Sequence, residues 1–373
     1  MITTKAAVLH GMHQPWEIME LDVVPPKDGE VLVRYVASGL CHSDYHVVLG
    51  DWGDFIRFPY VSGHEGAGVV EEVGPGVTDI KVGDHVVCSF ISACGHCRWC
   101  AAGRSNLCDS GAGALEGRYP DGGFRLVKDG VEYGSSMMLG TFSQWGTVSR
   151  NSIVKVNDWL PLESLVLLGC GVPTGFGSAV TAGGVKQGDN VVIYGAGGVG
   201  MNAVQGAAIA GALRVVVVDP VEGKRDAALR FGATHVFATA EEAHEFIFDA
   251  SWGVGADVSI VTVSTVSEKI VTDAINVLSK GGTTVLTAVA HPELKTINFP
   301  GLLLTQYERT IKGALFGSGN PHFEIPRLMR MYEEGKLMLD ELVTARYRLE
   351  DINQGYQDMV DGKNIRGIIV HEH

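Results

Sequence analysis

The stretch between residues 190 and 219 constrains the fold of this chain more than any other. Val191-Val192-Ile193-Tyr194 is a continuous apolar run, as expected of a strand buried on both faces of a parallel sheet. It leads into the glycine-rich segment 195–200, an alanine-rich segment typical of a helix, and then Val215-Val216-Val217-Val218-Asp219. The pattern predicts a strand, a tight turn, a helix and a second strand, which is the repeating unit of doubly wound parallel sheets.

The glycine-rich turn has the spacing of a dinucleotide-binding site. It consists of Gly195, Ala196, Gly197, Gly198, Val199 and Gly200. Glycines at this spacing permit a tight turn, close approach of a pyrophosphate and close helix packing, while the helix N-terminus favours the anion. Asp219 ends the second strand, where its carboxylate is expected to bind the adenosine ribose hydroxyls and to repel a 2′-phosphate. The sequence therefore predicts a site for NAD in preference to NADP.

Helical and strand patterns alternate through the rest of this region. Predicted helices span 224–231, 240–250 and 267–278, and predicted strands span 235–237, 257–262 and 283–288. This alternation completes a doubly wound sheet. After about residue 315 the pattern changes to helices at 322–334 and 349–361 and a strand at 368–370, and we expect this tail to rejoin the N-terminal part.

The first 90 residues have a different pattern. Short Val-rich runs at 6–9, 31–36, 68–73 and 85–89 are separated by Pro and Gly turn signals, which predicts a small antiparallel β domain. A chain of 373 residues exceeds what one core usually supports, so two domains are expected.

Composition excludes several classes of partner. The formal charge of −14 argues against nucleic acid and anionic membranes, since both reward clustered Lys and Arg. The longest uncharged run, residues 190–213, is interrupted by glycines and amides, so we expect a buried strand and helix and not a membrane span. The N-terminus lacks the basic segment followed by an apolar segment that is typical of a secretory signal, which predicts a cytoplasmic protein. In that reducing compartment the cysteines are expected to bind metal more than to form disulfides.

Four of the seven cysteines form a metal-binding pattern. Cys94, Cys97, Cys100 and Cys108 follow the spacing C-x2-C-x2-C-x7-C, so one short loop can place four thiolates around a tetrahedral ion. Such a site has no open coordination position and predicts a structural zinc lobe. An iron–sulfur cluster remains the alternative, because four cysteines also serve that group.

A second set of polar residues is spread along the chain. Gly39 to His46 places a thiol, a hydroxyl, a carboxylate and two imidazoles directly after a predicted strand, where they form either a metal site with a proton path or only a polar loop. His64-Glu65 lies between two glycines, and a solvated pair is its simpler interpretation. Cys170 ends an apolar segment next to glycine, whereas Cys88 lies in an apolar run and is most simply a core thiol.

Taken together, these motifs resemble the zinc-dependent medium-chain alcohol dehydrogenases over essentially the whole chain. The resemblance rests on Gly63-His64-Glu65, the four-cysteine lobe, Cys170-Gly171, Gly195 to Gly200 with Asp219, and Asn364-Ile365-Arg366. It implies an α/β protein with a Rossmann doubly wound parallel sheet and a mainly β, GroES-like catalytic domain. The catalytic domain would span 1–171 and 316–373 with the zinc lobe at about 92–110, and the NAD-binding domain would span 172–315.

The resemblance also implies a catalytic metal site. Cys41, His64 and Cys170 would hold a catalytic zinc, which with the structural zinc makes two Zn²⁺ ions per chain. Glu65 would lie behind the metal as an alternate or outer ligand, and Asp44 would orient His64. Zinc is a Lewis acid that lowers the pKa of a bound alcohol, so an alkoxide forms near neutrality.

Further roles concern the proton, the hydride and the cofactor. Ser43, the nicotinamide ribose and His46 would carry the substrate proton away while a hydride passes to the nicotinamide. The family's remaining cofactor contacts fall on His42, Thr174, Val199, Lys224 and Arg366. His42 stands where many relatives carry Arg against the pyrophosphate. Trp52, Phe90, Met138 and Leu139 match positions that line the substrate pocket in relatives, although ordinary core packing is the alternative for each.

A narrower resemblance points to one subfamily. Segments 202–207, 219–222 and 231–235 look like the nicotinoprotein, or NDMA-dependent, alcohol dehydrogenases of actinobacteria, in which NAD stays bound and an external acceptor reoxidises it. The alternatives are an ordinary dehydrogenase with exchangeable NAD(H) and, from another class, a non-catalytic NAD-binding relative that keeps only the structural zinc. Glutathione-dependent formaldehyde dehydrogenases carry an Arg shortly after the last lobe cysteine, which this chain lacks. The expected partners are a small alcohol or aldehyde and a further copy of the chain, in a homodimer or homotetramer.

Overall fold

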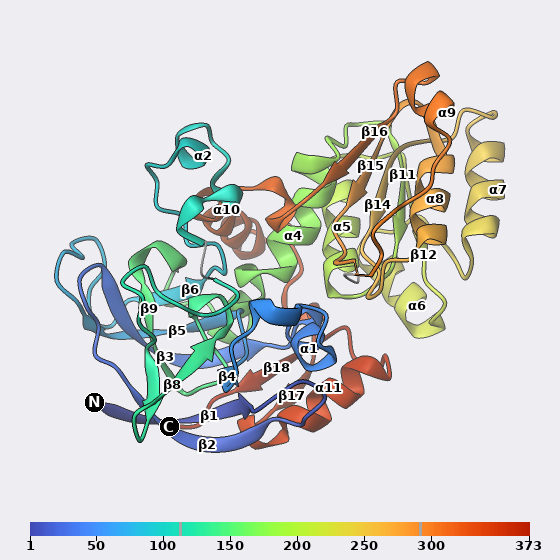
Figure 1. Ribbon diagram of the computed structural model, residues 1–373. Coiled ribbons are helices and arrows are strands. Elements are labelled where there is room, and N and C mark those ends of the chain that lie inside the picture. The colour runs from blue at the N-terminus through green and yellow to red at the C-terminus, as the bar shows by residue number, and fades with distance from the viewer. Residues whose placement is uncertain (112–113, 291–292) are drawn as a thin grey trace. The chain divides into compact units, whose positions relative to one another are not determined.

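The computed structural model describes residues 1–111, 114–290 and 293–373 (Figure 1). The chain divides into two units, one of Met1–Cys170 with Asn320–His373 and the other of Gly171–Gly319. The C-terminal segment thus groups with the N-terminal unit. The boundaries fall after Cys170 and before Asn320, whereas the sequence placed them after residue 171 and before residue 316.

The first unit contains a closed barrel and a larger sheet. The barrel order is β1 (Ile2–Leu9), β2 (Glu17–Val23), β7 (Leu126–Lys128), β8 (Val131–Ser135) and β4 (Tyr60–Val61). The seven-stranded sheet has the order β10 (Ile153–Lys155), β6 (His85–Cys88), β5 (Gly66–Val73), β3 (Glu30–Gly39), β18 (Arg366–Val370) and β17 (Val343–Tyr347), and β9 (Trp145–Ser149) also pairs with β3.

Strand β3 organises this unit because it pairs antiparallel with β5, β9 and β18. Its Val31, Val33 and Tyr35 are fully buried in one hydrophobic cluster, as the apolar alternation of the segment predicts. The strand continues to Gly39, beyond the expected end of the run, because Ser38 and Gly39 pair with β18. That pairing comes from the far end of the chain, which local sequence does not reveal.

The helices of the first unit include one in a segment for which a polar loop was one of two interpretations. They are α1 (His42–Leu49), α2 (Arg98–Ala101), α3 (Leu162–Leu165), α10 (Pro321–Glu333) and α11 (Ile352–Val360). The interpretation of residues 39–46 as a polar loop is wrong, since α1 begins within it at His42. Val47 of α1 is buried with Ile352 and Tyr356 of α11, so a tertiary contact stabilises a helix whose sequence is rich in polar residues.

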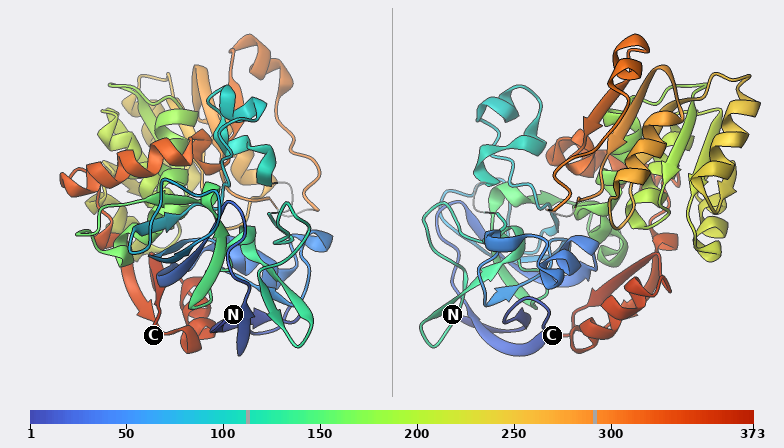
Figure 2. Two further views of the ribbon diagram at one scale, coloured as in Figure 1. Left: turned by 90° about the vertical axis from the view of Figure 1, so that its left-hand side faces the viewer. Right: turned by 45° about the vertical axis from the view of Figure 1, so that its right-hand side comes forward.

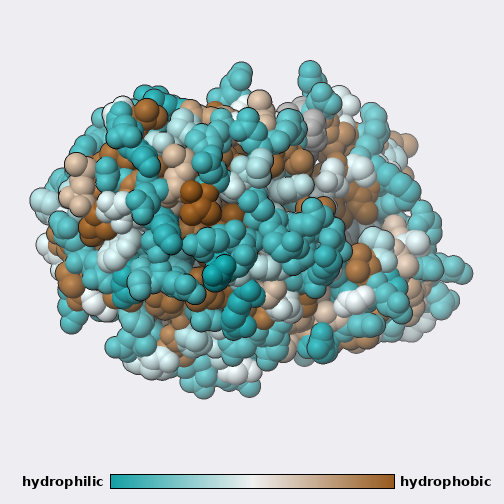
Figure 3. Space-filling model, turned by 90° about the horizontal axis from the view of Figure 1, so that it is seen from below, coloured by the Kyte–Doolittle hydropathy of each residue, from teal (hydrophilic) through white to brown (hydrophobic). Residues whose placement is uncertain are grey.

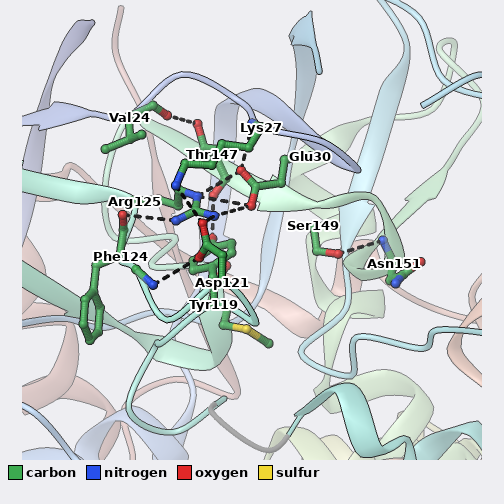
Figure 4. Close-up of polar contacts among 12 residues, drawn as sticks. Val24, Lys27, Glu30, Tyr119, Asp121, Phe124, Arg125, Thr147, Ser149 and Asn151 are labelled. Carbon is green, nitrogen blue, oxygen red and sulfur yellow. Dashed lines mark hydrogen bonds and ion pairs between the residues drawn. The ribbon is translucent and has the colours of Figure 1, made fainter. Parts of the chain in front are cut away.

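A buried ion-pair network fixes the segment before β7 (Figure 4). Nη2 of Arg125 donates to Glu30 Oε1 at 2.6 Å and to Asp121 Oδ2 at 3.0 Å, and the Arg125 side chain is 3% exposed. The guanidinium lies over the Tyr119 ring, 4.2 Å from its centroid. Tyr119 Oη in turn lies 2.6 Å from the carbonyl oxygen of Met138. The network therefore connects β3 to the loop that carries a predicted pocket residue.

The second unit is a six-stranded parallel sheet with helices on both faces (Figure 2). The strand order is β13 (His235–Phe237), β12 (Arg214–Val218), β11 (Asn190–Tyr194), β14 (Ala256–Val261), β15 (Leu278–Leu286) and β16 (Thr310–Gly313). Its helices are α4 (Gly171–Gly177), α5 (Gly198–Ile209), α6 (Glu222–Arg230), α7 (Ala240–Ala250), α8 (Glu268–Asn276) and α9 (Gly301–Gln306). The strand order reverses between β11 and β14, and ligands of such sheets bind at this switch point.

The surface shows no concentrated apolar region in the view of Figure 3, where hydrophilic residues cover most of the face and apolar ones are scattered. Among the described residues, no single helix has the length and apolar character needed to cross a membrane. One bent pair, Leu162–Gly169 with Gly171–Ala182, meets the criteria by length and composition only.

Candidate active site and metal centres

Four buried side chains of the first unit converge at the carboxyl end of β3. The ligand atoms of Cys41, His64, Glu65 and Cys170 all lie within 4.8 Å of one another. Cys41 directly precedes α1, His64 and Glu65 directly precede β5, and Cys170 follows the short helix Val166–Gly169. Two thiols, an imidazole and a carboxylate form a donor set that suits Zn²⁺. The structure thus brings together the three residues that the resemblance named and the carboxylate expected beside them.

Glycines allow the chain to approach itself at this point. Gly63 has φ +91°, and a Cβ there would lie 2.5 Å from Thr141 Oγ1. A Cβ at Gly39 would overlap the Glu65 carboxylate. Only glycine tolerates both the positive φ at position 63 and the crowding at position 39 without a shift.

The imidazole of His64 is held by Asp44. Its Nδ1 lies 3.0 Å from Asp44 Oδ2, and the two side chains are 3% and 0% exposed. The other Asp44 oxygen accepts a hydrogen bond from the Gly63 backbone N–H at 2.8 Å. Burial acts to lower the pKa of His64, but the Asp44 carboxylate and Cys41 raise it well above its usual value. Because Nδ1 is occupied by Asp44, Nε2 is the nitrogen left for a metal.

The two thiols and Glu65 are electrostatically linked. A hydrogen bond with Cys170, together with nearby His64, lowers the pKa of Cys41 well below its usual value despite burial. Burial raises the pKa of Glu65, an effect that the Arg366 guanidinium opposes. Arg366 was expected to contact the cofactor; in the structure its side chain is 5% exposed and forms an ion pair with Glu65. Its charge is therefore directed at the candidate metal-ligand cluster, and its contact with the cofactor stays a prediction.

The predicted proton-relay residues lie on α1. Ser43 Oγ is 3.7 Å from Cys41 Sγ, and His46 lies one turn further along the helix. His46 Nδ1 contacts Asp51 Oδ2 at 2.5 Å, a partner that sequence reasoning missed. The available signal was an acid directly after Gly50, the glycine that ends α1.

The predicted pocket residues are placed in different settings. Phe90 packs edge-on against the His64 ring, with centroids 5.7 Å apart. Trp52 Nε1 donates to the Ser43 carbonyl oxygen at 3.2 Å. Met138 and Leu139 are each 2% exposed and belong to hydrophobic clusters, as the core alternative expects. Their role in a substrate pocket stays a prediction.

The four-cysteine lobe forms a second possible metal centre. The Sγ atoms of Cys94, Cys97, Cys100 and Cys108 lie within 4.8 Å of one another. Cys97 donates its backbone N–H to Cys94 Sγ at 3.3 Å. Slight burial acts to raise the pKa of Cys94, but backbone N–H groups of His96 and Cys97 lower it to about 6. N–H donors of this kind favour the thiolates that a tetrahedral metal requires.

The glycine-rich turn of the second unit joins β11 to α5. Gly195 has φ +96°, and a Cβ at Gly200 would overlap the Gly195 carbonyl oxygen, whereas a Cβ at Gly197 would meet open space. Asp219 Oδ2 accepts from the Ala196 N–H at 2.8 Å, so this carboxylate also holds the turn in place. Four further predicted contacts lie in the same unit: Gly198 and Val199 in α5, Thr174 in α4 and Lys224 in α6. His42 is the first residue of α1 in the first unit, and its contact with the cofactor stays a prediction.

Both units match models of known families. Residues 27–158 match the alcohol dehydrogenase GroES-like domain, and residues 198–334 match the zinc-binding dehydrogenase family. A protein from Amycolatopsis methanolica named NDMA-dependent alcohol dehydrogenase is 59% identical over 368 residues, which cover 99% of each chain. Putative alcohol dehydrogenase D of Mycobacterium tuberculosis is 58% identical over 99% of this chain and 100% of its own.

A solved structure agrees with these matches. Benzyl alcohol dehydrogenase from Acinetobacter calcoaceticus has a TM-score of 0.92 at 32% identity, with both chains fully covered. The GroES-like and Rossmann architecture predicted from the sequence is confirmed, as is the assignment to the alcohol dehydrogenases. This chain belongs to the zinc-dependent medium-chain alcohol dehydrogenase family.

Proposed function

We propose that this alcohol dehydrogenase interconverts small alcohols and aldehydes by hydride transfer, using NAD(H) and a zinc ion held by Cys41, His64 and Cys170. The observation that carries the proposal is the buried convergence of these three side chains with Glu65 within 4.8 Å. Three protein ligands leave a coordination position for substrate, as catalytic zinc sites require. Zinc at this site would supply a Lewis acid that lowers the pKa of the alcohol.

The protein's own residues then have separate tasks. Asp44 fixes the tautomer and orientation of His64, and the ion pair with Arg366 keeps Glu65 at the back of the cluster as an outer ligand. The Ser43 hydroxyl takes up the alcohol proton, which leaves through His46. The turn at 195–200 binds the NAD(H) pyrophosphate through the N-terminus of α5, with Asp219 at the adenosine ribose.

Metal analysis tests the zinc assignment. We expect about two zinc ions per chain in the parent protein, one at the Cys41 cluster and one at the four-cysteine lobe. Cys41→Ser should lose about one zinc and nearly all activity, whereas Cys97→Ser should lose the other zinc and lower the melting temperature. A Cys41→Ser variant with full zinc and full activity would refute the catalytic site. Iron and inorganic sulfide in place of the second zinc would favour the cluster alternative for the lobe.

We further propose that NAD(H) stays bound through the cycle and that an external acceptor reoxidises it. Support comes from the name of the Amycolatopsis relative, NDMA-dependent alcohol dehydrogenase, and from its 59% identity. The purified protein should retain NAD(H) after exhaustive dialysis and oxidise alcohols with an artificial acceptor such as NDMA, but only weakly with added NAD. Loss of all nucleotide on dialysis, with activity restored by free NAD, would establish the ordinary exchangeable mechanism instead.

A further inference from the structure

A largely buried histidine–carboxylate pair joins the last turn of α1 to the turn that follows the helix. His46 Nδ1 lies 2.5 Å from Asp51 Oδ2, and the two side chains are 10% and 9% exposed. A backbone hydrogen bond joins the same two residues, because the Asp51 N–H donates to the His46 carbonyl oxygen at 3.0 Å. The pair is thus part of a closed turn and not a chance surface contact.

The turn that creates the pair depends on Gly50. This residue ends α1 in the left-handed conformation, with φ 82°, and reverses the chain so that Asp51 faces back toward the helix. The next residue, Trp52, donates its indole N–H to the Ser43 carbonyl oxygen at 3.2 Å. The side chains of Asp51 and Trp52 therefore contact His46 and Ser43, the two residues to which we assign the proton path.

The chemistry of the pair fixes which imidazole nitrogen is available. A carboxylate only accepts hydrogen bonds, so Nδ1 of His46 carries the proton that it donates to Asp51. The neutral ring then has Nε2 as its single acceptor. His42 is the other imidazole on this helix, and the centroids of the two imidazole rings lie 6.3 Å apart, which is too far for a direct hydrogen bond.

We propose that Asp51 is a positioning residue for the proton path: it holds His46 in the tautomer whose Nε2 accepts the alcohol proton. The proposal rests on the proposed function of His46. On each oxidation Nε2 gains the proton, the imidazolium forms beside the Asp51 carboxylate, and the proton is then released to solvent. No other bond of His46 or Asp51 changes.

Asp51→Asn tests this assignment with little change in shape. Its amide can donate to Nδ1 and stabilise the opposite tautomer, in which Nε2 already carries a proton. We expect kcat for alcohol oxidation to fall about 10- to 100-fold with KM within about twofold, and the solvent deuterium isotope effect on kcat to rise as proton transfer becomes limiting. Asp54→Asn is the matched control, because Asp54 is an exposed acid three positions on and should leave kcat and the isotope effect unchanged.

A double-mutant cycle separates positioning from a general structural effect. If Asp51 acts through His46, Asp51→Asn added to His46→Gln should lower kcat no further, since the acceptor is already absent. Equal losses in both backgrounds would overturn the proposal, as would an Asp51→Asn enzyme with parent kcat. Nitrogen chemical shifts of ¹⁵N-labelled histidine give an independent readout, because His46 should change tautomer in Asp51→Asn and not in Asp54→Asn.

The two levels of the proposal fail in different ways. If His46→Gln keeps parent activity, the proton path through His46 is wrong, whatever Asp51 does. If His46→Gln is impaired but Asp51→Asn is not, the path stands and only the role of Asp51 is lost. Melting temperatures of all variants identify a folding defect, and Asp51→Ala provides a second substitution should the amide variant be unstable.

Discussion

The Asp44 carboxylate lies 3.0 Å from Nδ1 of His64, and neither side chain is more than 3% exposed. The same carboxylate accepts the Gly63 N–H, so one acid fixes both the imidazole and the backbone next to it. A metal-binding histidine gains affinity from such a partner, because its tautomer and ring plane are set before the metal arrives.

Asp44→Asn should therefore weaken zinc binding at the Cys41 cluster. We expect a loss of about 10- to 100-fold in affinity, with activity falling in parallel, since the amide is uncharged and can select the wrong tautomer. Competition with a zinc chelator measures the affinity. Glu324→Gln is the control, because Glu324 is a buried acid of the same unit that pairs with Arg327 and is not a member of the cluster. Unchanged chelator resistance in Asp44→Asn would contradict the role of this acid.

Gly39→Ala should disturb the same cluster by crowding. The added Cβ would overlap the carboxylate of Glu65, which is fully buried and paired with Arg366 and so has no free space into which to move. Overpacking of this kind costs about 1–3 kcal/mol, and we expect a lower melting temperature together with loss of activity.

Gly223→Ala is the comparison for this change. A Cβ at Gly223 would meet nothing within 4 Å, and the residue lies within α6. Alanine in a helix is favoured over glycine by about 1 kcal/mol, so this variant should keep its activity and melt no lower than the parent. If both variants behaved alike, the crowding at Gly39 would not matter for the site.

Local sequence predicted the second unit well because its signals are local. Helix α7 begins and ends where expected, and Thr239 and Glu242 form the capping box that starts it. Strands β11, β12 and β14 are mostly buried apolar runs that need no distant partner to be recognised. Strand β16 was not predicted, because its four residues are half-buried or exposed. In contrast, α1 was missed, because its stability depends on packing against α11 from the far end of the chain.

The candidate site could be predicted only in part. Its glycines and cysteines have specific spacing, but Cys41, His64 and Cys170 lie far apart in the sequence and were joined only through resemblance to a family. Asp51 was missed because its meaning depends on a left-handed residue at Gly50 that turns the chain back onto α1. The ion pair of Arg366 with Glu65 was missed because it spans 301 positions of sequence.

The buried pair of Arg125 and Glu30 should contribute strongly to the stability of the first unit. Their side chains are 3% and 8% exposed, so Arg125→Met leaves the Glu30 charge buried without its partner. We expect a loss of about 3–5 kcal/mol in the free energy of unfolding, measured by urea titration. Arg125→Met combined with Glu30→Met should recover most of this, since no unpaired charge remains.

Arg34→Met serves as the control for that prediction. Arg34 pairs with Glu71 on the same sheet, but the two side chains are 29% and 33% exposed. Water screens such a pair, and its loss should cost less than about 1 kcal/mol. Equal costs for Arg34→Met and Arg125→Met would show that burial of the Arg125 network has no special effect.

His371 should make the protein less stable as the pH falls. Burial lowers its pKa from 6.5 to about 3, and its Nε2 lies 2.9 Å from Ser38 Oγ and 3.2 Å from the Thr141 carbonyl oxygen. Between these two pKa values the unfolded chain binds a proton that the folded chain does not, so stability rises with pH through this window. The contribution of His371 to the free energy of unfolding is fully present above about pH 6.5 and is lost as the pH decreases toward 3.

Replacing His371 with a residue that does not titrate should remove this part of the pH dependence. Between pH 7.5 and pH 5.5 the parent protein should lose about 1.4 kcal/mol more of its free energy of unfolding than His371→Gln does. Urea titrations of zinc-loaded protein at both pH values measure the difference, and any pH effect on the metal sites cancels because both proteins share them. His371→Asn should behave like His371→Gln. A parent and a variant with the same pH dependence would mean that His371 takes up a proton in the folded state as readily as in the unfolded chain.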